Sequence, residues 1–311
     1  ITSKICVIMK KVVIILVGIV LLAGVIFTGT YGVSQKNIEV YERAMEMQSI
    51  ADTIGWADFR IADYPIAVYD GENEYVFTRN EGGYELNKRA VTMNFLVATA
   101  YPVDDHFEVI TPSVEQMSSF IGLASAGATE YGSVEHSVTL WHEAFHCYQL
   151  TNYMEAIKNI CPEGIEENTI TLHADTNEGA VDLFKRQAEL LEAAVKSEDI
   201  DRIRAYIVEY KKLEEERNAL LDEKIIHTEE YYERVEGGAY YVEALMHGEM
   251  NPEKFQNDYI GGISGFSNGS SKYYRTGMAQ YMIMDVLNPG WKADYEFSEP
   301  VMELIYEELE I

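Results

Sequence analysis

Basic residues are scarce in this chain: 24 lysines and arginines stand against 52 aspartates and glutamates, which gives a formal net charge of −28. No basic patch and no nucleic-acid-binding motif occurs in it. A field of this sign repels DNA and RNA, so the sequence excludes nucleic acid as a partner. Much of the acid falls in helical runs such as residues 214–216, where its role is to solvate the surface.

Cysteine is also rare, with 3 residues in the chain. Cys147 and Cys161 are too few to form a disulfide framework. Because Cys147 directly follows His146, it points about 100° away from that histidine on a helix. We interpret it as a core thiol or as half of a single disulfide, and not as a metal ligand. The 47% of hydrophobic residues is enough for a sizeable core in one or two domains.

Charge is absent from residues 12–33, which follow Lys10 and Lys11. The stretch 12–27 consists almost entirely of Val, Ile, Leu, Gly and Ala, and the whole run is long enough to cross a bilayer. This pattern predicts a transmembrane helix with its lysines in the cytoplasm, and hence a single-pass protein of the cell membrane whose remainder is extracytoplasmic. A cleaved signal peptide is the alternative, with residues 28–30 as a weak cleavage site.

The rest of the chain divides into a β-rich part, residues 34–132, and a mainly helical part, residues 133–311, after the cytoplasmic stub and anchor at 1–33. The predicted fold class is therefore α+β with an N-terminal transmembrane helix. Local patterns predict strands in residues 64–69, 75–77 and 91–101, a helix with a lead-in within 35–61, and helices in 134–157, 177–196, 200–221, 223–246 and 278–287. A glycine–serine loop, residues 261–271, precedes the last helix.

A His-Glu-x-x-His pentad, formed by His142, Glu143 and His146, is the most informative motif. On a helix, positions i and i+4 lie on one face about one turn apart, so the two imidazoles can bind one Zn²⁺ ion. Glu143 then lies where it can take a proton from water at the metal. The flanking segment is apolar and contains no Gly or Pro, and a buried helix with such polar groups is unfavourable unless they have partners.

A catalytic zinc ion needs a third protein ligand and one open position. Two segments are candidates. Glu236 is followed by the small residues Gly237, Gly238 and Ala239, which would let its helix pack closely against the pentad helix. Glu178 stands near a helix start, and Asp182, one turn further on, could accept the N–H of a histidine.

At these residues the chain resembles the gluzincin class of zinc metallopeptidases. The stretch from Glu236 to Tyr241 is similar to the Glu-Gly-x-Ala-x-Tyr segment that carries the third ligand in several gluzincin families, whereas residues 177–182 are similar to the Asn-Glu-x-x-x-Asp stretch of thermolysin-like peptidases. The resemblance covers residues 142–243, departs from both patterns in the spacing after His146, and favours Glu236 as the ligand. It implies a zincin-like catalytic domain and Zn²⁺ as the cofactor.

The tetrahedral intermediate of peptide hydrolysis needs a donor for its oxyanion. Tyr240 lies one turn beyond Glu236, and Tyr273, Tyr274 and Arg275 follow the glycine–serine loop, an arrangement similar to Gly-rich, Tyr-bearing segments of some gluzincins. We assign this role to Tyr274. The other histidines, His173, His227 and His247, have no predicted role.

The sequence thus predicts a membrane-anchored, extracytoplasmic zinc metallopeptidase that acts on a peptide or protein substrate. One alternative is a zincin-like pseudoenzyme or an extracellular binding or sensor module, which would bind zinc without hydrolysis. The other is a membrane-tethered structural protein with a metal-free histidine pair.

Overall fold

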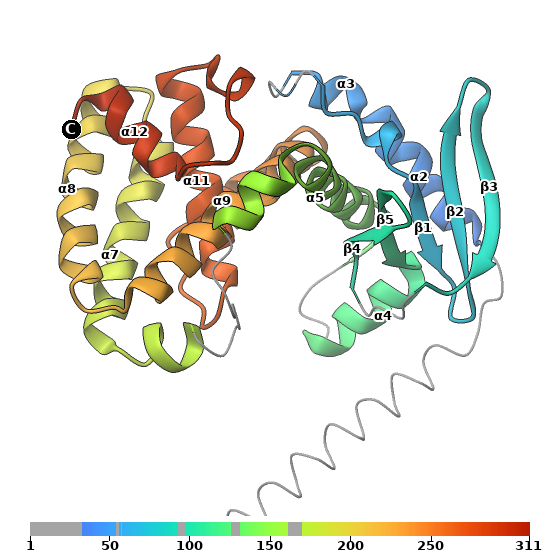
Figure 1. Ribbon diagram of the computed structural model, residues 1–311, viewed down its shortest axis with the longest axis horizontal. Coiled ribbons are helices and arrows are strands. Elements are labelled where there is room, and N and C mark those ends of the chain that lie inside the picture. Colours follow the sequence, from blue (N-terminus) through green and yellow to red (C-terminus); the bar gives the residue numbers. More distant parts are fainter. Residues whose placement is uncertain (1–32, 54–55, 57, 93–96, 126–130, 161–169) are drawn as a thin grey trace, which may run out of the picture. The chain divides into compact units, whose positions relative to one another are not determined.

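The computed structural model describes residues 33–53, 56, 58–92, 97–125, 131–160 and 170–311 (Figure 1). Its fold class is α+β, mostly helical with one five-stranded sheet. The chain divides into two units: one contains the residues up to Met45 together with Ala62–Leu140, and the other contains Glu46–Ile61 and Trp141–Ile311. The second boundary falls within helix α5 (Ser133–Ile160).

The first unit is built on the sheet. Its strands are β1 (Ile66–Tyr69), β2 (Asn73–Asn80), β3 (Gly83–Ala90), β4 (Thr99–Val103) and β5 (His106–Pro112), in the spatial order β3-β2-β1-β5-β4. β1 is parallel to β5, and the other neighbours are antiparallel. The central strand β1 is a short apolar run because it is buried on both faces, whereas the edge strand β3 is mostly exposed.

Helices α2 (Gln35–Glu46) and α4 (Val114–Ala124) belong to the first unit, as does the beginning of α5. Helix α2 packs through Tyr41 onto Phe77 of β2, with 4.5 Å between the stacked ring centroids. Helix α4 follows β5 directly and begins with a capping box formed by Ser113 and Gln116. The 3₁₀ turn η1 (Ile61–Asp63) leads into β1.

His136, near the start of α5, is a fully hydrogen-bonded histidine in the core of the first unit. Its Nδ1 lies 3.0 Å from the hydroxyl of Tyr131, and its Nε2 lies 3.3 Å from the hydroxyl of Thr111. The side chain is 1% exposed, and this burial lowers the pKa of His136 to about 4. The imidazole is therefore neutral in the folded protein near neutral pH.

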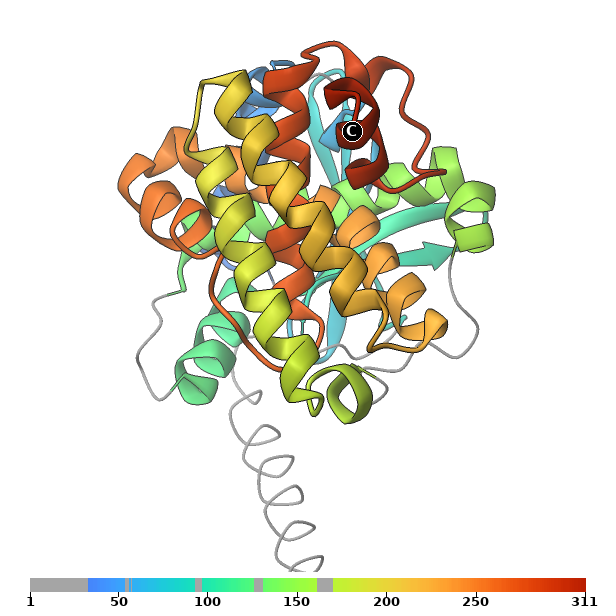
Figure 2. The same cartoon turned by 90° about the vertical axis from the view of Figure 1, so that its left-hand side faces the viewer.

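The second unit is helical. Helices α7 (Glu178–Val195) and α8 (Ile200–Asn218) lie side by side in both views (Figures 1 and 2), and α9 (Glu223–Met250) packs against α11 (Ser271–Leu287). Asn177, Asp199 and Asp222 cap the N-termini of α7, α8 and α9. The remaining elements are α3 (Gln48–Ala51), η2 (Ile170–Ala174), α10 (Pro252–Lys254), η3 (Phe255–Ile260), η4 (Trp291–Ala293) and α12 (Val301–Leu309).

An aromatic core holds the second unit together. Trp56 lies at its centre, with ring centroids 4.7 Å from Phe145 and 6.3 Å from Phe297. Trp141 and Tyr148 extend the buried face of α5, and both contact Phe59. Because this face of α5 is packed into the core, the rotation of the helix about its axis is set, and with it the direction of the pentad side chains.

The predicted membrane helix requires a correction. Within the described ranges, no helix is both long enough and apolar enough to cross a bilayer. The longest helices, α5 and α9, have 28 residues each, but charged side chains such as Glu155 and Lys158 of α5 rule them out. The fold class is therefore corrected to α+β without such a helix among these residues, and the single-pass membrane location is not retained. Residues 12–32 of the predicted span lie outside the described part of the chain.

Most of the predicted helices are confirmed. α5, α7, α8 and α9 each begin within one residue of the predicted start, because apolar periodicity and capping residues mark these positions locally. α11 begins at Ser271, seven residues before the prediction at 278, because Gly277 lies inside the helix instead of ending the preceding loop. The sequence predictions did not include β3, β5, α4 and α12.

Candidate metal centre

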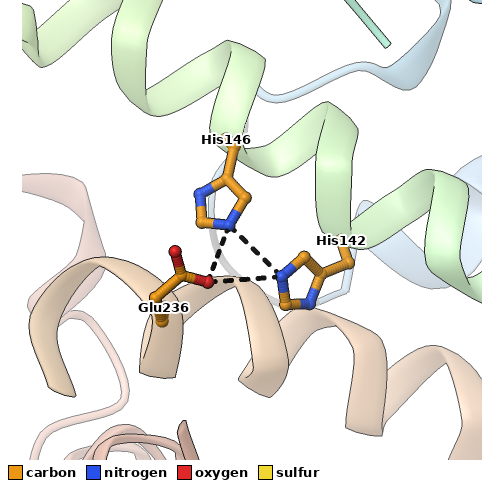
Figure 3. Close-up of side chains that lie close together, drawn as sticks. All are labelled: His142, His146 and Glu236. Atoms are coloured by element: carbon orange, nitrogen blue, oxygen red, sulfur yellow. Dashed lines mark hydrogen bonds and ion pairs between the residues drawn. The ribbon is translucent and has the colours of Figure 1, made fainter. Parts of the chain in front are cut away.

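Two helices bring three side chains of the kinds that can bind a metal ion to one point. His142 and His146 extend from α5, and Glu236 extends from α9 toward both of them (Figure 3). The two imidazole Nε2 atoms are 3.2 Å apart, and the Glu236 Oε2 atom lies 3.1 Å from His146 Nε2 and 3.6 Å from His142 Nε2. Ligand atoms of a tetrahedral zinc ion with bonds of about 2.0–2.1 Å are about 3.3–3.4 Å apart. The triangle thus has the dimensions of one face of such a site.

The other ring nitrogen of His142 is hydrogen-bonded to a carboxylate. His142 Nδ1 lies 2.9 Å from Glu243 Oε2, and Glu243 Oε1 accepts a hydrogen bond of 2.8 Å from the hydroxyl of Tyr259. The same hydroxyl lies 2.8 Å from Nδ1 of His247. Since an ionised carboxylate only accepts hydrogen bonds, His142 carries its proton on Nδ1 and directs the Nε2 lone pair toward the cluster.

The corresponding nitrogen of His146 is paired with an amide. His146 Nδ1 lies 2.8 Å from Oε1 of Gln149, and Nε2 of Gln149 donates a hydrogen bond of 3.0 Å to the carbonyl oxygen of Val235. The amide oxygen therefore faces His146 and accepts its Nδ1 proton. In consequence, both histidines direct the Nε2 lone pair to the point that Glu236 also faces.

This donor set fits a cation. With both imidazoles neutral and protonated on Nδ1, the two Nε2 atoms and the Glu236 carboxylate present three acceptors to one another. Without a cation, a proton has to lie between these acceptors. Burial alone would lower the pKa of His142, but hydrogen bonds with Glu236 and Glu243 and the charge of Glu143 outweigh it, so that the pKa lies well above its ordinary value. Two imidazoles and one carboxylate form a ligand set that Zn²⁺ accepts.

The centre remains accessible from solvent. Side-chain exposure is 10% for His142, 12% for His146 and 22% for Glu236. Burial by itself raises the pKa of Glu236. The charge of His146 and the hydrogen bonds with both histidines have a larger, opposite effect, so the pKa lies well below its ordinary value. Glu236 is therefore a carboxylate at neutral pH, as a zinc ligand has to be.

Glycines explain how α9 approaches its neighbours so closely beside Glu236. A Cβ atom on Gly237 would lie 2.6 Å from the Cα atom of Gly277 in α11, and one on Gly277 would lie 2.2 Å from the carbonyl oxygen of Glu233. A Cβ atom on Gly238 would lie 2.9 Å from the hydroxyl of Tyr281 and 3.4 Å from Gln149 Nε2. The small residues after Glu236 thus let two helices pack against α9 at the level of the candidate metal centre.

Tyr274, the predicted oxyanion donor, lies beside the centre. Its ring centroid is 6.3 Å from that of His142. Burial and the nearby Glu236 carboxylate raise the pKa of Tyr274, so the hydroxyl keeps its proton. Glu143, the predicted base, is half-buried, and its charge acts on both histidines and on Tyr274.

The competing candidates for the third ligand lie elsewhere. Glu178 is exposed in the first turn of α7, and Asp182 is exposed and lies 3.9 Å from Lys185. Among the described residues, the group that could hold a metal ion consists of the two histidines and Glu236.

The remaining predicted candidates have contacts of other kinds. Tyr273 is buried and donates a hydrogen bond to Glu229, and Arg275 donates one to the carbonyl oxygen of Gly265. Cys147 is buried and forms no disulfide within the described part of the chain, and Cys161 lies outside that part.

Three residues around the centre, Glu243, Gln149 and Tyr259, were not found from the sequence. Glu243 follows Glu236 by seven residues, two helical turns, and therefore lies on the same face of α9. Gln149 follows His146 by three residues, which again places it on one face of the helix. These spacings could have indicated Glu243 and Gln149 from the sequence. Tyr259 comes from η3, and no local pattern connects it to the centre.

Comparison with known proteins adds no relative: no family model, no curated protein and no solved structure matches this chain. The resemblance to gluzincins therefore stays a prediction based on the pentad and the Glu236 segment.

Proposed function

We propose that the protein is a zinc-dependent hydrolase that cleaves peptide bonds. The observation that carries this proposal is the convergence of His142 Nε2, His146 Nε2 and Glu236 Oε2 within 3.6 Å of one another. A carboxylate that can serve as a base, Glu143, directly follows the first of them in the sequence. Three protein ligands with solvent access are typical of a catalytic zinc site, whereas a structural site is closed by a fourth protein ligand.

The protein residues have distinct roles in this proposal. A bound zinc ion supplies a Lewis acid that lowers the pKa of water and polarises a carbonyl group. Glu143 accepts the proton of the attacking water and then donates it to the amine that leaves. Tyr274 keeps its hydroxyl proton and can donate a hydrogen bond to the oxyanion of the tetrahedral intermediate. Glu243 and Gln149 hold the imidazoles in the tautomer that directs Nε2 to the metal.

The proposal is tested with zinc analysis and a peptide library. The purified protein is expected to contain one zinc ion per chain and to cleave peptides in a reaction that a chelator stops and added zinc restores. Glu143→Gln is expected to retain zinc and to lose hydrolysis, because an amide does not accept the proton of water. Glu155→Gln is the matched control, since Glu155 lies on the same helix with 88% of its side chain exposed.

Each outcome has a separate meaning. A wild-type protein without zinc affinity would refute the metal centre itself. Zinc binding without cleavage of any peptide would favour a binding or sensor module over an enzyme. Full activity in Glu143→Gln would refute the role of Glu143 as the base.

A further inference from the structure

Gln149, next to the proposed metal centre, is fully buried and hydrogen-bonded at both ends of its amide. Its side chain is 0% exposed, and both ends of its amide are engaged: Oε1 with His146 Nδ1 at 2.8 Å, and Nε2 with the carbonyl oxygen of Val235 at 3.0 Å. Val235 immediately precedes Glu236 in α9. One side chain on α5 therefore connects a metal-binding histidine to the backbone beside the third metal-binding residue.

The direction of each hydrogen bond follows from the one before it. A backbone carbonyl only accepts, so the NH₂ group of Gln149 has to face Val235. The amide oxygen then faces His146 and accepts its Nδ1 proton. The proton on Nδ1 leaves the lone pair on Nε2, the atom that lies 3.1 Å from Glu236. The carbonyl oxygen of α9 thus selects the metal-binding tautomer of a histidine on α5.

Gly238 of α9 lies next to the amide of Gln149. A Cβ atom on Gly238 would lie 3.4 Å from Gln149 Nε2, at the edge of ordinary van der Waals contact. His142 is oriented differently, because its partner Glu243 is a carboxylate that accepts through either oxygen. Only the His146 side therefore depends on which end of an amide faces the imidazole.

We propose that Gln149 is a positioning residue that locks His146 in its metal-binding tautomer and ties that ligand to the segment carrying Glu236. This inference rests on the zinc centre of the proposed function. Removal of such an orienting partner lowers metal affinity by about 10–100-fold in zinc proteins. The affinity for zinc is therefore the direct measure of the role of Gln149, independent of any hydrolysis.

The experiment compares zinc affinity in three variants by competition with a chromophoric chelator. Gln149→Met removes the acceptor at similar length and is expected to weaken zinc binding by about 10–100-fold. Gln149→Glu keeps an acceptor facing His146 and is expected to recover affinity to within about tenfold of wild type. Gln187→Met is the matched control, because Gln187 is a buried glutamine on α7 with 2% exposure, and its zinc affinity should equal that of wild type.

A second readout uses the wild-type protein alone and does not depend on the folding of a variant. Nitrogen NMR of the zinc-loaded protein is expected to show His146 with its proton on Nδ1 and the metal on Nε2. Metal on Nδ1 of His146 would overturn the inference, as would unchanged zinc affinity in Gln149→Met. If wild-type protein fails to bind zinc, the metal centre itself is refuted, which is a different outcome from either of these.

Discussion

Replacing Gly277 by alanine tests whether the close crossing of α9 and α11 positions Glu236 in the proposed metal centre. An alanine Cβ atom at this position would lie 2.2 Å from the carbonyl oxygen of Glu233 and 2.8 Å from the Cα atom of the same residue. An ordinary contact begins at about 3.4 Å, so α9 has to recede from α11 by roughly 1 Å. The clash is with backbone, which cannot rotate away as a side chain can.

The displacement affects stability and metal binding together. Overpacking of this kind destabilises the fold by about 1–3 kcal/mol, whereas the better helix propensity of alanine offsets about 1 kcal/mol. Because backbone is involved, we expect a net loss in the free energy of unfolding of roughly 2 kcal/mol. Tyr274 and Glu236 each lie three residues from the clash, so a shift of this size is expected to lower zinc affinity by about 10–100-fold.

Chemical denaturation and zinc competition measure the two effects on the same preparations. Gly122→Ala is the control, since Gly122 lies within helix α4 and a Cβ atom there would have no neighbour within 4 Å. It is expected to stabilise the protein by up to about 1 kcal/mol and to leave zinc affinity unchanged. If Gly277→Ala keeps both the stability and the zinc affinity of wild type, the close crossing does not position Glu236.

Three further predictions concern single residues. Glu236→Ala should lose zinc on dialysis against a mild chelator, whereas Glu178→Ala should keep it, and zinc lost only from the latter would reverse the ligand assignment. Tyr274→Phe should retain zinc and lower kcat by about 10²–10³-fold, the effect of removing an oxyanion donor, and an unchanged kcat would exclude that role. His136 makes stability depend on pH, because its pKa of about 4 in the fold lies below its ordinary value of 6.5. The unfolded chain then binds the proton more readily, so stability is full above about pH 6.5 and falls by roughly 3 kcal/mol as the pH drops to about 4. His136→Gln should remove this part of the loss, and equal acid sensitivity in both proteins would contradict it.

Local sequence determined the helical elements and two of the three side chains of the candidate metal centre. His142 and His146 share one helix face because their spacing of four residues matches the helical period, whatever the rest of the chain does. The N-cap residues Asn177, Asp199 and Asp222 mark helix starts in the same local way. For these features the backbone hydrogen bonds lie within a few residues of one another, so no distant contact is needed to infer them.

Tertiary structure decided the rest. Glu236 and Glu178 were both plausible ligands, and only the packing of α9 against α5 and α11 brings Glu236 to the histidines and leaves Glu178 exposed. Gly277 resembled a loop residue because glycine disfavours helices, but its lack of a side chain permits the helix crossing. Glu243, Gln149 and Tyr259 gain their roles from contacts between segments up to about a hundred residues apart. Helical spacing places Glu243 on the same face of its helix as Glu236, and Gln149 on the same face as His146. The contacts themselves follow from side-chain packing between segments, which no single segment encodes.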